Sequence, residues 1–401
     1  MREKTDRTTG WFGGSVLGEG RMKITILQGA FLPVPALRGG AIEKAWEALG
    51  QAFAKQGHEV THVSRLCDGL PPREKIGEVR HIRVRGANAV SGAWLLKLLE
   101  VPYLFRARRV LPEADILVTH AFWAPLFLPR DRFGKLYLHV GRFPKGQMKL
   151  YKKASRFQVP SHAVAKAVIR EIPKRENLVS VLPYPLGWSV PEGKPAHERP
   201  RRILYAGRLH PEKGVLELIE AFGGIGTKER KGWVLRIMGP WRKDQGGGGH
   251  GYLRSINDLA SKYGSCVEIL EPVFNSRELL EHYKRARVFA YPSLAQKGET
   301  FGLAVLEAMS CGCVPLVSDL ACFADFVAPD KNGFVFRMDD DRIVENLRSE
   351  LQRILDCGNK WNNFSMEARR VAKGFQIKEV ATNYLEDFSR ILDRKKVPFR
   401  T

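Results

Sequence analysis

Short apolar runs alternate with amphipathic stretches along the first half of the chain. Residues 22–28 (MKITILQ) predict a buried strand, and residues 41–56 carry apolar side chains at helical spacing. Gly57 stands where that helix would end, and residues 58–64 (HEVTHVS) predict the next strand. Further strands are predicted at 79–84, 116–119, 135–139 and 156–159. This alternation is typical of a parallel sheet with helices on both faces.

The second half repeats the pattern after a segment of linker composition. Residues 181–202 contain five prolines and several charges. Six apolar runs then predict strands at 203–206, 234–238, 267–270, 288–290, 314–317 and 333–336. Three helical segments close the chain, the last near 377–392. The four glycines at 246–249 predict a flexible surface loop; whether it moves over a ligand is left open.

The two α/β runs predict an α/β fold with two Rossmann-like, doubly wound domains that face each other across a cleft, where ligands of such folds bind. The expected organisation is a disordered tail (1–21), an N-terminal acceptor-binding domain (22–190), a linker (191–202), a C-terminal nucleotide-sugar-binding domain (203–375) and a C-terminal helix that packs back toward the N-terminal domain (376–401).

Composition adds a charge asymmetry to this picture. The net charge is +22, and residues 1–190 hold 31 lysines and arginines against 15 acidic residues. Such a field favours an anionic partner or simply aids solubility. Residues 93–110 mix large apolar side chains with arginines, so they form either core, with Pro102 interrupting the helix, or a membrane-interface segment. The six cysteines form no C-x-x-C pair, which indicates free thiols and a cytoplasmic protein.

The strongest chemical signal is the segment 298–315, GETFGLAVLEAMSCGCVP. Glu299 and Glu307 are eight residues apart, and residues 300–303 resemble a loop that opens a helix over about 303–310. Free N–H groups and the helix dipole at such a start suit a diphosphate, and Gly302 permits close approach of the ligand. The carboxylates are good acceptors for paired sugar hydroxyls.

A second signal is AGRLHPEKG at 206–214. Gly207 turns the chain after a strand, and Arg208 and Lys213 follow in the loop. Arginine contacts a pyrophosphate in bidentate fashion, and lysine contacts it as a point charge. Alone this fragment is weak, because surface cations are common.

Together the two segments resemble the family-4 retaining glycosyltransferases of the GT-B fold, over nearly the whole chain from Met22. The glycine pair at 39–40, GHEV at 57–60 and IMGP at 237–240 belong to the same resemblance. It implies that Arg208 and Lys213 clamp the donor diphosphate, that Glu299 contacts the donor sugar near its reacting face, and that Glu307 binds the ribose. The other donor-binding positions it implies are Gly39, Gly40, Gly207, Gly239, Phe301, Gly302 and Leu303.

The resemblance also implies a histidine beside the transferred sugar. His139 ends the strand KLYLH and is assigned this role, which makes it a catalytic candidate with Glu299, Arg208 and Lys213; His120, which ends ILVTH, is the rival. Two segments depart from the family pattern: 183–185 reads Pro-Tyr-Pro, and 319–322 reads Asp-Leu-Ala-Cys.

The expected activity is retaining, metal-independent transfer of a hexose-type sugar from a UDP-sugar or GDP-sugar, with no cofactor. The expected acceptor is lipid-linked or an anionic glycan in cell-envelope or exopolysaccharide synthesis, reached at the inner face of the membrane. No nucleic-acid-binding signature appears. The alternative is a basic nucleic-acid- or membrane-binding protein on the same scaffold without transferase activity. The run Asp339-Asp340-Asp341 is expected to cap or precede a helix rather than hold a metal.

Overall fold

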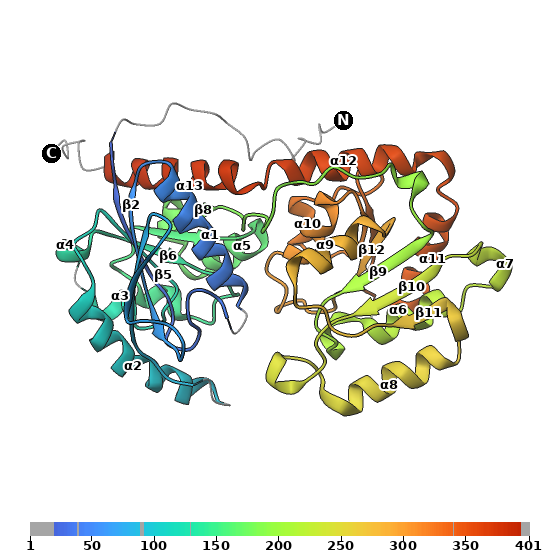
Figure 1. Cartoon of the computed structure of the whole chain (residues 1–401), viewed down its shortest axis with the longest axis horizontal. Helices are drawn as coiled ribbons and strands as arrows, with labels where there is room; N and C mark the ends of the chain where they lie inside the picture. The colour runs from blue at the N-terminus through green and yellow to red at the C-terminus, as the bar shows by residue number, and fades with distance from the viewer. Residues whose placement is uncertain (1–19, 38–39, 89–91, 129, 340, 394–401) are drawn as a thin grey trace. The chain divides into compact units, whose positions relative to one another are not determined.

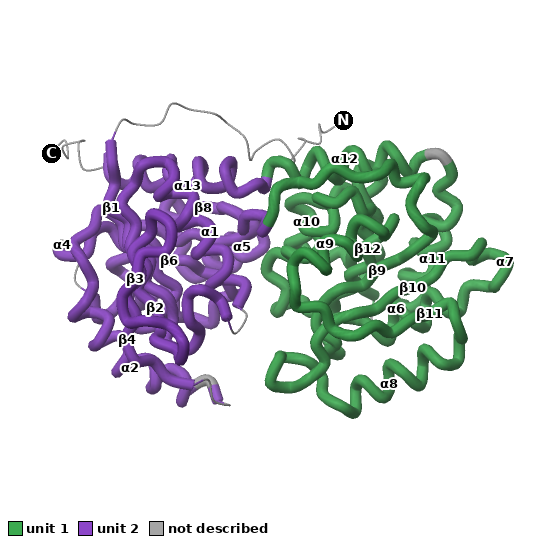
Figure 2. The backbone as a smooth tube through the Cα atoms, viewed as in Figure 1, with its two compact units in different colours: residues 1–12, 188–374 green, residues 13–187, 375–401 purple. Residues whose placement is uncertain are grey.

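The computed structural model describes residues 20–37, 40–88, 92–128, 130–339 and 341–393, so the predicted tail at 1–21 lies almost wholly outside the described residues. The described chain forms two compact units (Figures 1 and 2). Among the described residues, the N-terminal unit comprises 20–187 together with 375–393. The C-terminal unit comprises residues 188–374.

The N-terminal unit contains a sheet in the order β3-β4-β2-β1-β5-β6-β7-β8. All neighbouring strands pair in parallel except β3, which is antiparallel to β4. The strands are β1 (Lys23–Leu27), β2 (Glu59–Leu66), β3 (Arg73–Ile76), β4 (Val79–Arg85), β5 (Ile116–Thr119), β6 (Lys135–His139), β7 (Arg156–Val159) and β8 (Val179–Val181).

Helices cover both faces of this sheet. Their bounds are α1 (Ala41–Lys55), α2 (Ala93–Val110), α3 (Ala124–Phe127), α4 (Arg130–Phe133), α5 (His162–Glu171) and α13 (Ile377–Asp393). One face is covered by α1 and α13, whose aromatic rings pack together. The ring centroids of Trp46 and Tyr384 are 5.3 Å apart, and those of Phe53 and Phe388 are 5.6 Å apart. On the other face, α2 and α5 share one apolar core with the strands.

The C-terminal unit contains a parallel sheet in the order β11-β10-β9-β12-β13-β14. Its strands are β9 (Arg202–Ala206), β10 (Val234–Met238), β11 (Val267–Ile269), β12 (Val288–Tyr291), β13 (Val314–Ser318) and β14 (Phe334–Phe336). Its helices are α6 (Val215–Gly223), α7 (Thr227–Arg230), α8 (Gly249–Ser261), α9 (Ser276–Lys284), α10 (Leu303–Ser310), α11 (Ile343–Leu355) and α12 (Trp361–Lys373). Two mainly parallel sheets with flanking helices confirm the predicted α/β class.

The expected linker at 191–202 packs on the C-terminal unit. Arg199 is buried, and its guanidinium donates hydrogen bonds to the carbonyl oxygens of Ala286 and Cys311 at 3.1 and 2.8 Å. A buried cation with several oxygen acceptors fixes this segment firmly to the unit.

Two local predictions were wrong. Helix α2 runs through Pro102 without interruption. The carbonyl oxygen that proline leaves without its helical partner belongs to Leu98, which is exposed, so water can satisfy it.

The glycines at 246–249 are not a loose loop. The amides of Gly247, Gly248 and Gly249 donate to the carbonyl oxygens of Arg242, Leu209 and Trp241 at 2.7–2.8 Å, and α8 begins at Gly249. A side chain at Gly247 would collide with the Trp241 backbone, which explains glycine there.

Candidate active site

The candidate donor site lies where the strand order of the C-terminal sheet reverses. Strands β9 and β12 are neighbours, and the loops after them carry the two predicted motifs. In open α/β sheets, ligands bind outside the carboxyl ends of the strands at this point. The topology therefore brings the Arg208 loop and the Glu299 loop, about ninety residues apart in sequence, to one place.

Two glycines make this edge of the sheet compact. Gly239 follows β10 with φ of 150°, and a Cβ there would overlap the carbonyl oxygen of Gly207, which follows β9. A Cβ on Gly207 would stand 3.0 Å from the Tyr205 hydroxyl. Both predicted donor-binding glycines are thus required for close backbone approach, whatever ligand is bound.

The structure places Arg208 at the edge of the site with two protein partners. Its guanidinium donates to the carbonyl oxygen of Gly246 at 2.6 Å and to Oε1 of Glu212 at 2.7 Å. The Tyr205 hydroxyl donates to the Arg208 carbonyl at 2.8 Å and so holds its backbone. Glu212 was not predicted as a site residue, although it lies inside the quoted segment GRLHPEKG.

Lys213 and Glu299 form the centre of the site. The Lys213 Nζ lies 2.7 Å from Oε2 of Glu299, and both side chains are largely buried. The ammonium also lies 5.5 Å from the centroid of the Tyr291 ring. The Tyr291 hydroxyl is hydrogen-bonded to Glu299. Burial and the nearby carboxylate raise the pKa of Tyr291 well above its usual range, so the hydroxyl stays protonated and donates this hydrogen bond.

The start of α10 supplies the third part of the site. Gly302 precedes the helix in the left-handed conformation, φ 81°, and a Cβ there would clash with the Phe323 ring. The amides of Leu303 and Ala304, the first two of the helix, have no carbonyl acceptor one turn earlier, whereas the Val305 amide donates to the Gly302 carbonyl at 2.9 Å. The Phe301 side chain is buried 5.4 Å from Phe326, so this residue offers only its backbone to a ligand.

Glu307 lies on α10 in a half-buried position. It is hydrogen-bonded to the Tyr283 hydroxyl, and burial with this carboxylate raises the pKa of Tyr283 well above its usual range. The carboxylate is therefore oriented by a buried tyrosine, as Glu299 is by Tyr291. Neither tyrosine was predicted, because nothing in the sequence links a strand or a helix to a glutamate many residues later.

The N-terminal unit has its own reversal point, between β1 and β5. His120 follows β5, with its Nε2 3.8 Å from Oε1 of Glu43 in the first turn of α1. Gly40 precedes α1 with φ of 104°, and a Cβ there would overlap the Glu43 carboxylate. The partner glycine, Gly39, lies outside the described residues.

His139 is placed differently from His120. It is buried, and its Nδ1 and Nε2 lie 2.5 Å from Oε1 of Gln158 and 3.0 Å from the Tyr184 hydroxyl. Tyr184 belongs to the Pro-Tyr-Pro segment that departs from the family pattern. Desolvation lowers the pKa of His139 to about 4 and that of His120 to about 3, so both rings are neutral at pH 7.

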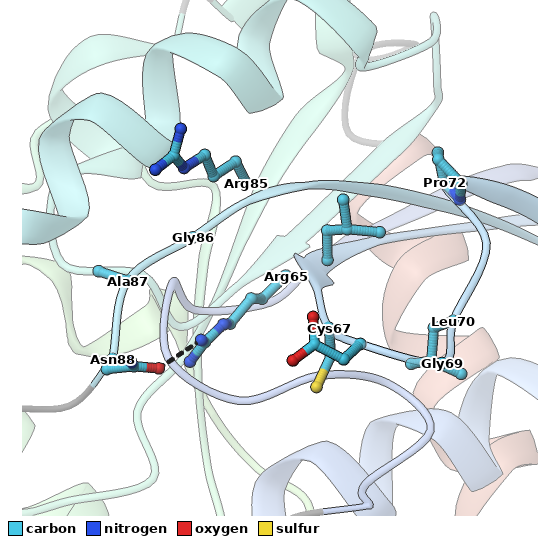
Figure 3. Close-up of a pocket in the computed structure, with 11 residues that line it drawn as sticks. Arg65, Cys67, Gly69, Leu70, Pro72, Arg85, Gly86, Ala87 and Asn88 are labelled. Atoms are coloured by element: carbon cyan, nitrogen blue, oxygen red, sulfur yellow. Dashed lines mark hydrogen bonds between the residues drawn. The ribbon is translucent and has the colours of Figure 1, made fainter.

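A cavity of about 600 Å³ opens at the carboxyl ends of β2 and β4 (Figure 3). Arg65 reaches Asn88 with a 2.5 Å hydrogen bond, and it also donates to the Phe31 carbonyl at 2.8 Å. Arg85 points away from Arg65, so the two arginines do not converge on one ligand group. Asp68 adds a carboxylate, which makes the lining polar and mixed in charge.

A metal-binding cluster and a membrane-spanning helix are both absent from the described part of the chain. No group of three or more histidine, cysteine or acidic side chains is placed there to hold a metal ion. No helix among the same residues has the length and apolarity needed to cross a bilayer.

Comparison with known proteins gives a family match over the C-terminal unit. Residues 189–371 match the family described as glycosyl transferases group 1. The uncharacterized glycosyltransferase YqgM of Bacillus subtilis is 24% identical over 223 residues, which are 55% of this chain and a little over half, 57%, of YqgM. Spore coat protein SA of the same bacterium is 22% identical over 92% of this chain and all of that protein.

The fold matches over almost the whole chain. A sucrose-phosphate synthase from Thermosynechococcus elongatus superposes with a TM-score of 0.74 and 20% identity, over 93% of this chain and 100% of that one. Such enzymes have the GT-B fold. The family match covers the unit that carries Arg208, Lys213 and both glutamates, so this unit is similar to the group 1 glycosyltransferases.

Proposed function

We propose that this chain is a retaining hexosyltransferase of the family-4 type, which uses a UDP-sugar or GDP-sugar without a bound metal or cofactor. The observation that carries the proposal is the meeting of Arg208, Lys213, Glu299 and the start of α10 at the strand reversal. This set combines diphosphate-binding groups with a buried carboxylate beside them.

The donor diphosphate would bind between the two cations and the α10 amides. Arg208 pairs with Glu212 and Lys213 with Glu299 in the structure, so a diphosphate would compete with these carboxylates for the hydrogen bonds of the two cations. As the bond from the sugar to the phosphate breaks, negative charge grows on the leaving nucleotide. Cations and a helix dipole fixed in advance stabilise that charge, which is the task a divalent metal performs in other transferases.

Glu299 would lie on the sugar side of the diphosphate. A carboxylate there stabilises the positive charge that develops on the sugar as the leaving group departs. The Tyr291 hydroxyl would still hold this carboxylate after Lys213 turns to the diphosphate, which limits reorganisation during the reaction. Glu307, further along α10, would accept the ribose hydroxyls.

The acceptor side is assigned to the N-terminal unit, with a lipid-linked or anionic glycan as substrate in envelope or exopolysaccharide synthesis at the inner face of the membrane. The basic excess of residues 1–190 supports an anionic or membrane-bound acceptor. Within this unit we favour His120 over His139 beside the transferred sugar. His120 is part-exposed, whereas both ring nitrogens of His139 already have protein partners.

Calorimetric titration with UDP, GDP and ADP tests the proposal directly. One nucleotide should bind in the micromolar range, and Arg208→Ala/Lys213→Ala should weaken it by about 100-fold or more, since each charge-assisted contact contributes roughly 1.5–3 kcal/mol. Arg370→Ala/Lys373→Ala removes two exposed cations of α12 and serves as the control. Equal binding by wild type and the Arg208/Lys213 variant would rule out this donor site.

A further inference from the structure

One helix of the N-terminal unit exposes apolar side chains on the side that faces away from its core. Helix α2 turns Tyr103, Leu104 and Ala107 into the core. Its opposite side exposes Trp94 (77%), Leu98 (62%) and Phe105. A surface helix usually has one apolar face and one polar face. A helix that is apolar on both sides therefore indicates that its outer face contacts something other than water.

The apolar surface extends beyond α2. The Phe105 ring lies 6.2 Å from Phe127 of α3, which is also exposed, and Leu95 adds a further side chain. Seven of the nine large apolar side chains exposed among the described residues belong to the N-terminal unit, five of them on this patch; the patch comprises Trp94, Leu95, Leu98, Phe105 and Phe127. Figure 1 shows α2 along the margin of its unit.

The exposed charges of α2 have one sign. Residues 93–110 contain a single carboxylate, Glu100, which is buried beneath the helix and accepts a hydrogen bond from the Trp123 amide at 3.2 Å. The cations of the same helix are Lys97, Arg106, Arg108 and Arg109. The Lys97 Nζ lies 4.9 Å from the Trp94 ring centroid and 4.1 Å from that of Phe122, so this cation stands among the aromatic rings at the edge of the patch.

Aromatic and leucine side chains ringed by lysine and arginine match the interface of a bilayer that contains anionic lipids. Each cation near such a surface adds about a fivefold gain in affinity. A second copy of this chain fits the face less well, because two-fold pairing of the patch would bring like charges together.

We propose that the Trp94–Phe127 patch and its flanking cations are a docking surface for an anionic lipid bilayer. The docking surface rests on the proposed function, since an enzyme with a lipid-linked acceptor must reach the membrane that holds this acceptor. Insertion would seat the N-terminal unit on the membrane through α2.

Flotation with vesicles tests the surface. Wild-type protein should float with vesicles containing about a third phosphatidylglycerol, at least about tenfold more than with pure phosphatidylcholine, and high salt should weaken the binding. Trp94→Glu/Leu98→Glu should lose vesicle binding, and Arg108→Ala/Arg109→Ala should lose the preference for anionic lipid. Phe274→Glu makes the same change at an exposed apolar residue (66%) of the other unit and should bind like wild type.

Two further measurements separate the possible failures. Sedimentation velocity shows whether the patch instead joins two copies: a wild-type dimer that Trp94→Glu/Leu98→Glu dissociates, without vesicle binding, overturns the proposal. Nucleotide titration on the same proteins monitors the transferase site. Normal nucleotide binding with no vesicle binding refutes the docking surface alone, whereas vesicle binding without nucleotide binding refutes the donor site alone.

Discussion

The two units place different chemistry at equivalent points of their sheets. At the reversal between β9 and β12 the side chains are Arg208, Glu212, Lys213 and Glu299, arranged as ion pairs. At the reversal between β1 and β5 the part-exposed His120 imidazole lies beside Glu43, and partial desolvation lowers its pKa to about 3, so the ring is neutral at pH 7. Under the proposed function, this topology would hold a charged phosphate group in the C-terminal unit and sugar hydroxyl groups, beside His120 and Glu43, in the N-terminal unit.

The units also differ in what they bury. The N-terminal unit buries His62, His81 and His139, whereas the described histidines of the C-terminal unit are exposed or half-buried. His62 stacks 5.4 Å from His81 between β2 and β4, and both ring nitrogens of His81 lack a hydrogen-bond partner in the described structure. Burial lowers the pKa of His62 to about 3 and that of His81 to about 4.

Acid should therefore unfold the N-terminal unit first, the largest effect we expect. A histidine whose folded pKa is lowered gives its full stabilisation above its unfolded pKa of about 6.5 and loses it as the pH falls toward the folded value. At about pH 5 each of the three buried histidines should cost on the order of 2 kcal/mol of unfolding free energy. Peptide-resolved hydrogen–deuterium exchange at about pH 5 and about pH 7.5 measures the protection of the amides in each unit. Lowering the pH should reduce the protection of β2 and β4 more than that of β9 and β12. Equal acid sensitivity of the two units would contradict this contrast.

Glu299→Gln should produce the next largest effect, on turnover. Glutamine keeps the size of the side chain but removes the negative charge that faces Lys213 and the reacting sugar, so kcat should fall about 100–1000-fold, while nucleotide affinity changes less than about fivefold. Glu212→Gln, which removes the partner of Arg208 instead, is the comparison and should change kcat much less. If Glu299→Gln kept full activity, the negative charge of Glu299 would not contribute to turnover.

The smallest effect separates the two histidines of the N-terminal unit. His120→Ala should lower kcat/KM by about tenfold with little change in Tm, since the ring is part-exposed and has one distant partner. His139→Ala should instead lower stability by about 2 kcal/mol, because Gln158 and Tyr184 lose a buried partner. Thermal melts and initial rates on both variants measure the difference. The reverse result would return the substrate role to His139.

Strand β10, an apolar run, and helix α10, which follows the glycine of the two-glutamate segment, could be predicted from the sequence almost to the residue. Strand β3 (REKI) was not predicted because it is a charged edge strand, and strand β8 (VSV) was not predicted because it is short. Arg208, Lys213 and the two glutamates could be nominated because their spacing in the chain carries the signal. Their partners could not be nominated, since Tyr291 and Gly246 reach the site only through tertiary packing.

The pairing of the donor-site cations has a consequence for how fast substrate is captured. Arg208 and Lys213 are matched by Glu212 and Glu299, so these four side chains sum to zero formal charge before the donor arrives. If this is the donor site, the long-range attraction of an anionic nucleotide sugar would come from the +22 net charge of the chain as a whole, and not from these four side chains. Their contribution would begin at contact distance, where a diphosphate would exchange with the two carboxylates as the partner of the cations.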